Sequence, residues 1–109
     1  MQIIIGAIAY EVIEVAELAS EHGTLCGEIS STKCRIRIDA DMAAPVKQVT
    51  LWHEIIHGIL FNAGYREHDE QQIDALAYGL MQVLRDNPIL RADSVQRVTR
   101  RPRSTEKQV

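Results

Sequence analysis

Two histidines stand four residues apart in the stretch His53-Glu54-Ile55-Ile56-His57, and a glutamate follows the first of them directly. In an α-helix, residues i and i+4 lie one turn apart on the same face, so both imidazoles could bind one Zn²⁺ ion at about 2.1 Å. Glu54 would lie about 100° around the helix, beside the metal. Two ligands, an adjacent carboxylate and room for a water molecule are what a metallohydrolase requires. The spacing therefore predicts a zinc site with Glu54 as the general base.

The residues around this motif predict a buried helix over about 45–63. Pro45 suits the first turn of a helix, and Gly64 suits the left-handed position that follows its end. The apolar residues cover most of the helix circumference, and they are Val46, Val49, Leu51, Trp52, Ile55, Ile56, Ile59 and Leu60. Polar side chains in a buried helix need partners, which a metal ion would supply. The alternative is a helix that carries its histidines and a solvated glutamate by chance, and we favour the metal site.

A second helix is expected over about 69–86. Asp69 is a good N-cap, and Asn87-Pro88 should end the helix. Its apolar stripe, best explained by core packing, consists of Ile73, Leu76, Ala77, Leu80, Met81 and Leu84. The five-residue connection to the first helix suggests that the two helices pack antiparallel.

A catalytic zinc site normally has three protein ligands, so two histidines need a third. Glu70 and Asp74 stand four residues apart, and on a helix they share a face that could reach His53 and His57. Glu70 would then bind zinc, while Asp74 accepts a hydrogen bond from the outer nitrogen of a ligand histidine. The two carboxylates could exchange these roles. His68 is an alternative ligand, although we favour an ordinary loop position for it.

The first part of the chain predicts a small sheet. Residues 3–5 and 10–15 are rich in β-branched side chains and read as a strand pair, while residues 17–22 could form a short helical turn. Residues 25–29 and 33–38 flank a polar turn and predict a hairpin. The expected fold is α+β: a short, mainly antiparallel sheet packed on the His-Glu-x-x-His helix and on a second, carboxylate-bearing helix.

Length and composition are those of one small globular domain, with 109 residues, of which 46% are hydrophobic and 25% charged. The chain has no run of 18 or more apolar residues, and its amino terminus lacks the features of a signal peptide. We therefore expect no membrane association and a cytoplasmic location. In that compartment Cys26 and Cys34, which could face each other across the hairpin, should be reduced and packed thiols.

Charge divides the chain into a domain over residues 1–90 and a tail over residues 91–109. The tail carries six basic and two acidic side chains, whereas the domain carries 6 basic and 13 acidic ones. The tail has few apolar residues and is expected to be mobile. Basic tails can bind nucleic acid, but a solvated end is the simpler interpretation, so we do not expect nucleic acid as a partner.

The motifs on the two expected helices resemble those of known metallopeptidases. A His-Glu-x-x-His helix followed by a helix with Glu-x-x-x-Asp is similar to the ligand pattern of the glutamate zincins. More closely, Leu51-Trp52-His53-Glu54-Ile55-Ile56-His57-Gly58-Ile59-Leu60 and Ile73-Asp74-Ala75-Leu76-Ala77 resemble the compact ImmA/IrrE-type metallopeptidases of bacteria and phages. The resemblance covers residues 45–87 and extends to small prophage-encoded members.

This resemblance implies a zincin-like domain that uses Zn²⁺ and acts in the cytoplasm of a bacterial host or is encoded by a phage. It implies that Glu54 is the catalytic base and that His53, His57 and Glu70 are the metal ligands. The connection between His57 and Glu70 has 12 residues, which is shorter than in many glutamate zincins.

The leading hypothesis is hydrolysis of peptide bonds in a protein or peptide substrate. Tyr65 or His68 could help to stabilise the oxyanion, although packing or loop roles are favoured for both. The alternative is a non-catalytic, zinc-stabilised protein-interaction module with a regulatory role in a phage or prophage. In such a module the zinc ion should be bound by four protein ligands. The sequence offers three and no clear fourth, which favours catalysis.

Overall fold

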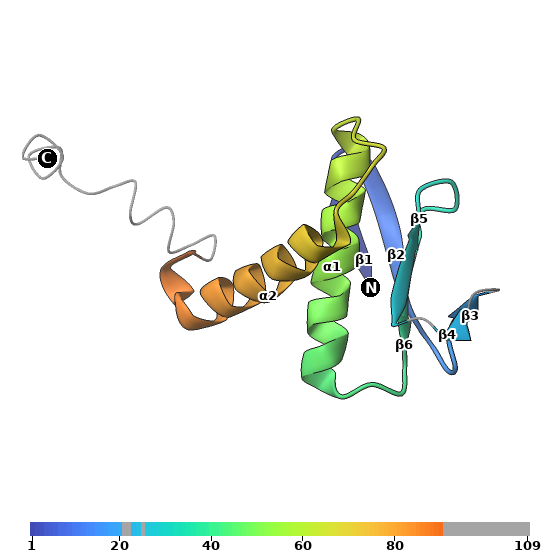
Figure 1. The fold of residues 1–109 in the computed structure, drawn as a ribbon, viewed down its shortest axis with the longest axis horizontal. Coiled ribbons are helices and arrows are strands. Elements are labelled where there is room, and N and C mark those ends of the chain that lie inside the picture. Colours follow the sequence, from blue (N-terminus) through green and yellow to red (C-terminus); the bar gives the residue numbers. More distant parts are fainter. Residues whose placement is uncertain (21–22, 25, 91–109) are drawn as a thin grey trace, which may run out of the picture.

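The computed structural model describes residues 1–20, 23–24 and 26–90, so the predicted tail lies outside the described residues (Figure 1). Two helices follow a set of short strands, which confirms the α+β class. The elements in chain order are β1 (Gln2–Ile5), β2 (Ile8–Val15), β3 (Ala19–Ser20), β4 (Gly23–Thr24), β5 (Gly27–Ser30), β6 (Arg35–Asp39), α1 (Ala44–Asn62), α2 (Glu70–Asp86) and the 3₁₀ turn η1 (Pro88–Leu90).

The main sheet has the strand order β1-β2-β6-β5. The predicted strand pair is the antiparallel pair β1–β2, and the predicted hairpin is the antiparallel pair β5–β6. These two units join through β2 and β6, which run parallel. The sheet is therefore mixed, with two antiparallel pairings and one parallel pairing, which agrees with the expectation of a mainly antiparallel sheet. The helical turn expected over residues 17–22 is wrong where the chain is described, because Ala19–Ser20 pairs with Gly23–Thr24 as a separate β-ribbon.

α1 covers one face of the main sheet (Figure 1). The core between them contains Ile5, Tyr10, Ile36 and Ile38, all at most 4% exposed, and Leu51 and Ile55 of α1 pack against this cluster. β6 supplies its alternate residues Ile36 and Ile38, as expected for a strand with one buried face, while Ile5 comes from β1 and Tyr10 from β2. The sheet therefore contacts only one side of α1. The other sides of the helix are free to contact α2 and to carry polar groups.

α2 packs on a different side of α1. The shared cluster contains Val49 and Ile56 of α1 with Ile73 and Ala77 of α2, and Trp52, Leu60 and Met81 pack around it. α2 crosses α1 and continues past it instead of running back along it, so the antiparallel arrangement is wrong (Figure 1). Because the helices meet only near their crossing, the predicted stripe is buried only in part: Leu76 is 53% exposed and Leu80 39%.

No helix in the described part of the chain has the length and apolar content needed to cross a membrane.

The limits of α1 agree closely with the sequence-based expectation. Gly64 has a φ of +93°, the left-handed conformation predicted for it, and its N–H donates to the carbonyl of Phe61 at 3.0 Å. The burial of α1 is less complete than expected, because Val46 and Ile59 are 42% and 51% exposed. They lie outside the two faces that pack on the sheet and on α2. Cys26 and Cys34 are both free thiols, as predicted, but Cys26 is exposed and not packed.

Gly27 lets α1 approach the edge strand β5 closely. A Cβ atom at this position would lie 2.7 Å from Cγ2 of Thr50 and 3.3 Å from the backbone oxygen of Arg37. Thr50 is short and β-branched, and the carbonyl belongs to the sheet, so neither neighbour can move far. Absence of a side chain at Gly27 therefore sets the distance between α1 and β5.

We expect Gly27→Ala to destabilise the fold by about 1–3 kcal/mol, the usual cost of overpacking a close contact. Gly79→Ala is the matched control: a Cβ atom at Gly79 meets nothing within 4 Å, and the residue lies inside α2. There the same change should stabilise the fold by about 0.5–1 kcal/mol, because alanine favours the helix. Chemical denaturation of both variants measures the two effects. Equal effects would contradict the close approach at Gly27.

Candidate metal centre

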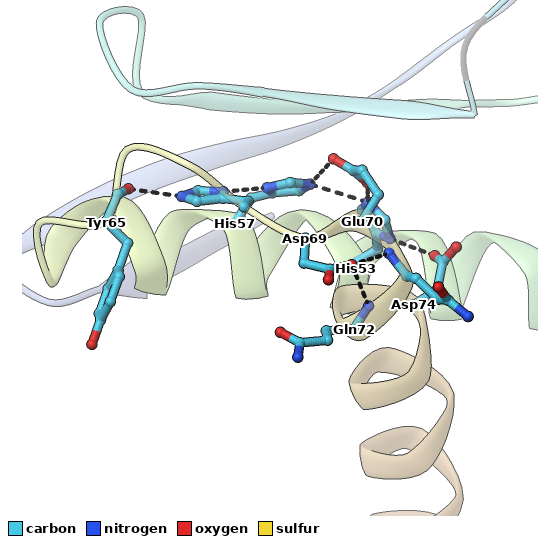
Figure 2. A network of polar contacts seen from close by, with 9 residues as sticks. His53, His57, Tyr65, Asp69, Glu70, Gln72 and Asp74 are labelled. Atoms are coloured by element: carbon cyan, nitrogen blue, oxygen red, sulfur yellow. Dashed lines mark hydrogen bonds and ion pairs between the residues drawn. The ribbon is translucent and has the colours of Figure 1, made fainter.

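Two helices bring three potential ligands to one point. α1 presents His53 and His57 one turn apart, and their side chains are only 18% and 13% exposed. α2 begins just beside them because Asp69 caps it: its Oδ1 accepts from the backbone N–H groups of Gln71 and Gln72 at 3.0 and 3.2 Å. This cap confirms the predicted helix start and places Glu70 in the first turn, where its carboxylate faces both imidazoles (Figure 2).

The three side chains are close enough to share one ion. Nε2 of His53 lies 2.9 Å from Oε2 of Glu70, and Nε2 of His57 lies 3.0 Å from Oε1 of the same carboxylate. The two Nε2 atoms are 3.1 Å apart. His53, His57 and Glu70 thus form a group that could hold a metal ion, and this group contains no fourth ligand among the residues that the structure describes.

The donor set fits zinc. Ligands bound at about 2.0–2.1 Å in tetrahedral geometry lie roughly 3.3 Å from one another, slightly more than the separations found here. Two imidazole nitrogens and one carboxylate are also the protein ligands of many catalytic zinc sites, which leave the fourth position for water. The group is accessible to solvent on the side of Glu70, whose side chain is 66% exposed. A small outward movement of the three side chains would accommodate the ion.

Asp74 lies at the outer nitrogen of His53. Its Oδ1 is 2.7 Å from Nδ1 of His53, a short hydrogen-bond distance (Figure 2). An ionised carboxylate only accepts, so Nδ1 of His53 carries the proton and Nε2 is directed at Glu70. The structure therefore brings both predicted carboxylates to the histidines, but at different atoms. Glu70 contacts Nε2 of both rings, and Asp74 contacts Nδ1 of His53.

Glu54 is buried beside this group. This residue is only 7% exposed. The pKa of Glu54 is raised from 4.5 to about 7: burial is the main cause, His53 acts in the opposite direction, and nearby Glu70 and Glu28 add to the increase. A carboxyl group with a pKa near neutrality in a cleft is typical of functional sites.

Burial also affects His57. It lowers the pKa of the His57 imidazole, with smaller contributions in the same direction from His53 and His68, while the Glu70 carboxylate raises it. The net lowering favours the neutral imidazole, which is the form that binds a metal.

Two hollows flank the group. One, of about 330 Å³, is lined by Val46, Val49 and Tyr78 on the side of His53. The other, of about 550 Å³, lies between β5 and the loop that contains Arg66. Both hollows reach Gly27, His53 and Glu54. The candidate metal centre therefore lies beside two neighbouring hollows between α1, α2 and the edge strand β5.

His68 does not join the group of ligands. Its Nδ1 lies 2.7 Å from Nδ1 of His57, the outer nitrogen of that ring, and its Nε2 lies 2.8 Å from the carbonyl oxygen of Tyr65. The Tyr65 side chain is 60% exposed and points away from the histidines (Figure 2). Neither residue thus occupies the positions considered for it, as third ligand or as oxyanion donor. Sequence spacing placed His68 near the site but did not indicate which ring it contacts.

Comparisons of the chain with protein-family models, with curated proteins and with solved structures found no match. What the structure supports is a possible metal-binding group of His53, His57 and Glu70 in an α+β fold.

Removal of Glu70 should weaken zinc binding most. We expect Glu70→Ala to raise the zinc Kd by more than about 100-fold, and Asp74→Asn to raise it by about 10–100-fold, the range found for the loss of an outer-nitrogen partner. Glu67→Ala is the control, because Glu67 is an exposed glutamate three residues before Glu70. Competition with a zinc-chelating dye measures all three values. If Asp74→Asn were the more damaging change, the two carboxylates would have exchanged roles.

Glu54 should make the metal-free protein less stable as the pH rises. The folded state holds the Glu54 proton up to a pH of about 7, whereas the unfolded chain loses it near 4.5, so stability falls between these values. The Glu54→Gln variant has no carboxyl group at this position, so it should not lose this stability as the pH rises. In the presence of a chelator, the variant should match the wild type at pH 4 and exceed it by about 3 kcal/mol at pH 8. Denaturation curves at both pH values measure the difference, and a pH-independent difference would contradict the raised pKa.

Proposed function

We propose that this chain is a zinc-dependent peptidase of the zincin type, similar to the ImmA/IrrE-type enzymes, which hydrolyses peptide bonds in a protein or peptide substrate. One observation carries the proposal: an open group of two histidines and Glu70 lies in a cleft beside the buried carboxyl group of Glu54. A site that serves only stability would be expected to be closed by a fourth protein ligand.

Zinc, when bound, supplies Lewis-acid chemistry that activates a water molecule and polarises a carbonyl group. Glu54 has the general base role in this proposal. Its carboxylate accepts a proton from the water as the water oxygen bonds to the scissile carbon, and then passes this proton to the departing amine. A pKa near 7 suits both transfers, because the group can gain and lose a proton at neutral pH.

The substrate would bind as an extended chain along β5. This strand is an edge of the main sheet, since β6 pairs with only one of its sides and no other described strand pairs with it. An open edge can accept a further strand through main-chain hydrogen bonds. Gly27, at the start of β5, lines both hollows and adds no side chain that would block the approach.

The second candidate is the non-catalytic interaction module, in which zinc only holds α2 against α1. A metal ion that joins Glu70 of α2 to the histidines of α1 would add to the apolar contact between the two helices, which is the argument for this role. The two candidates differ in the fourth coordination position, which water occupies in an enzyme and a protein ligand occupies in a structural site.

Zinc-loaded wild type and Glu54→Gln should be incubated with a library of synthetic peptides, and the products analysed by mass spectrometry. We expect the wild type to cleave a subset of peptides and the variant to bind zinc equally but to cleave about 10²–10⁴-fold more slowly. A chelator should stop the wild-type reaction.

Equal cleavage by Glu54→Gln would reject the base role of this residue. Binding of zinc without any cleavage, together with a fourth protein ligand in a crystal structure of the zinc-loaded protein, would favour the interaction module.

A further inference from the structure

His68 is held in place from two sides, although it belongs to the loop between the helices. Its ring packs on Phe61 in the last turn of α1, with ring centroids 4.6 Å apart. Its two nitrogens have separate partners, the Tyr65 carbonyl at 2.8 Å and Nδ1 of His57 at 2.7 Å. A ring with both nitrogens engaged has a defined orientation, so its protonation pattern can be worked out from its partners.

The Tyr65 carbonyl determines which nitrogen of His68 carries the proton. A carbonyl oxygen can only accept, so Nε2 of His68 must be the donor in that bond. A neutral imidazole has one N–H group, which leaves Nδ1 of His68 as an acceptor. The donor across the second contact must then be Nδ1–H of His57.

The geometry of the two rings agrees with this bond. The planes of His57 and His68 are inclined by 26°, and the ring centroids are 4.9 Å apart. Since the contacting nitrogens are separated by 2.7 Å, the rings must meet edge to edge and not face to face. An N–H···N hydrogen bond needs this arrangement, because the imidazole lone pair lies in the plane of the ring.

We infer that His68 is a positioning residue, which uses the Tyr65 carbonyl to hold His57 in the tautomer whose Nε2 lone pair faces Glu70 and His53. His68 acts on His57 as Asp74 acts on His53, but with a neutral acceptor in place of a carboxylate. Partners at the outer nitrogen fix both the tautomer and the direction of a metal-binding imidazole. This inference concerns the metal site and does not require that the site cleave peptides.

The first test compares two substitutions of His68 of similar size. Oδ1 of an asparagine is attached to Cγ, as Nδ1 of histidine is, so His68→Asn keeps an acceptor for His57 while His68→Leu does not. We expect His68→Leu to raise the zinc Kd at pH 7.5 by about 10–100-fold and His68→Asn to stay within a few-fold of the wild type. Both variants lose the bond to Tyr65, so equal losses would show that His68 only supports the loop, which would overturn the inference.

The second test observes the bond itself in the wild type. In the ¹⁵N-labelled, zinc-loaded protein, NMR should detect a proton on Nδ1 of His57, a proton on Nε2 of His68, and a scalar coupling between the two Nδ1 nuclei across the hydrogen bond. A proton on Nδ1 of His68 would overturn the inference, as would a wild-type protein that does not bind zinc. If zinc binds, the coupling is present and no peptide is cleaved, the proposed peptidase function fails while the role of His68 remains.

Discussion

The whole arrangement depends on α1 being buried on two separate sides. One side packs on the sheet through Leu51 and Ile55, and another packs on α2 through Ile56. With 3.6 residues per turn, positions four apart follow one line along the helix, and His53 and His57 occupy such a line between the two buried sides. The sheet and α2 therefore form the walls of a cleft whose floor carries both imidazoles. An apolar pattern that covers most of a helix thus reflects two partners, not complete burial.

This arrangement gives the two carboxylates of the centre different environments. Glu54 follows His53 directly and turns toward the sheet, where it is 7% exposed, whereas the side chain of Glu70 starts from the end of another helix and is 66% exposed. Burial disfavours the charged form of Glu54, and the Glu70 charge adds to this effect. A carboxyl group placed this way reduces the stability of the metal-free fold at neutral pH. Its position is consistent with the general-base role proposed for it.

Local spacing was enough to predict the parts of the centre that lie within single helices. The histidine pair follows from the helical repeat, and the position of Glu70 follows from the cap at Asp69, since both depend only on neighbours in the chain. The parallel pairing of β2 with β6 and the crossing direction of α2 depend on contacts between distant residues. Patterns of apolar residues show which face of a strand or helix is buried but not which partner covers it or at what angle. The partner of His68 was missed for the same reason, because the backbone of the loop decides it.

The neutral partner of His57 has a consequence for the charge of the centre. Among the described residues, Glu70 and Asp74 are the carboxylates in contact with His53 and His57, so a divalent cation would balance them. A carboxylate in place of His68 would hold the same tautomer of His57 but would add a third negative charge to the hollow that His68 and Glu54 both line. Like charges raise the pKa of a carboxyl group, and that of Glu54 is already about 7 because of burial. An imidazole acceptor fixes the direction of His57 without this effect, so Glu54 can still lose its proton near neutral pH.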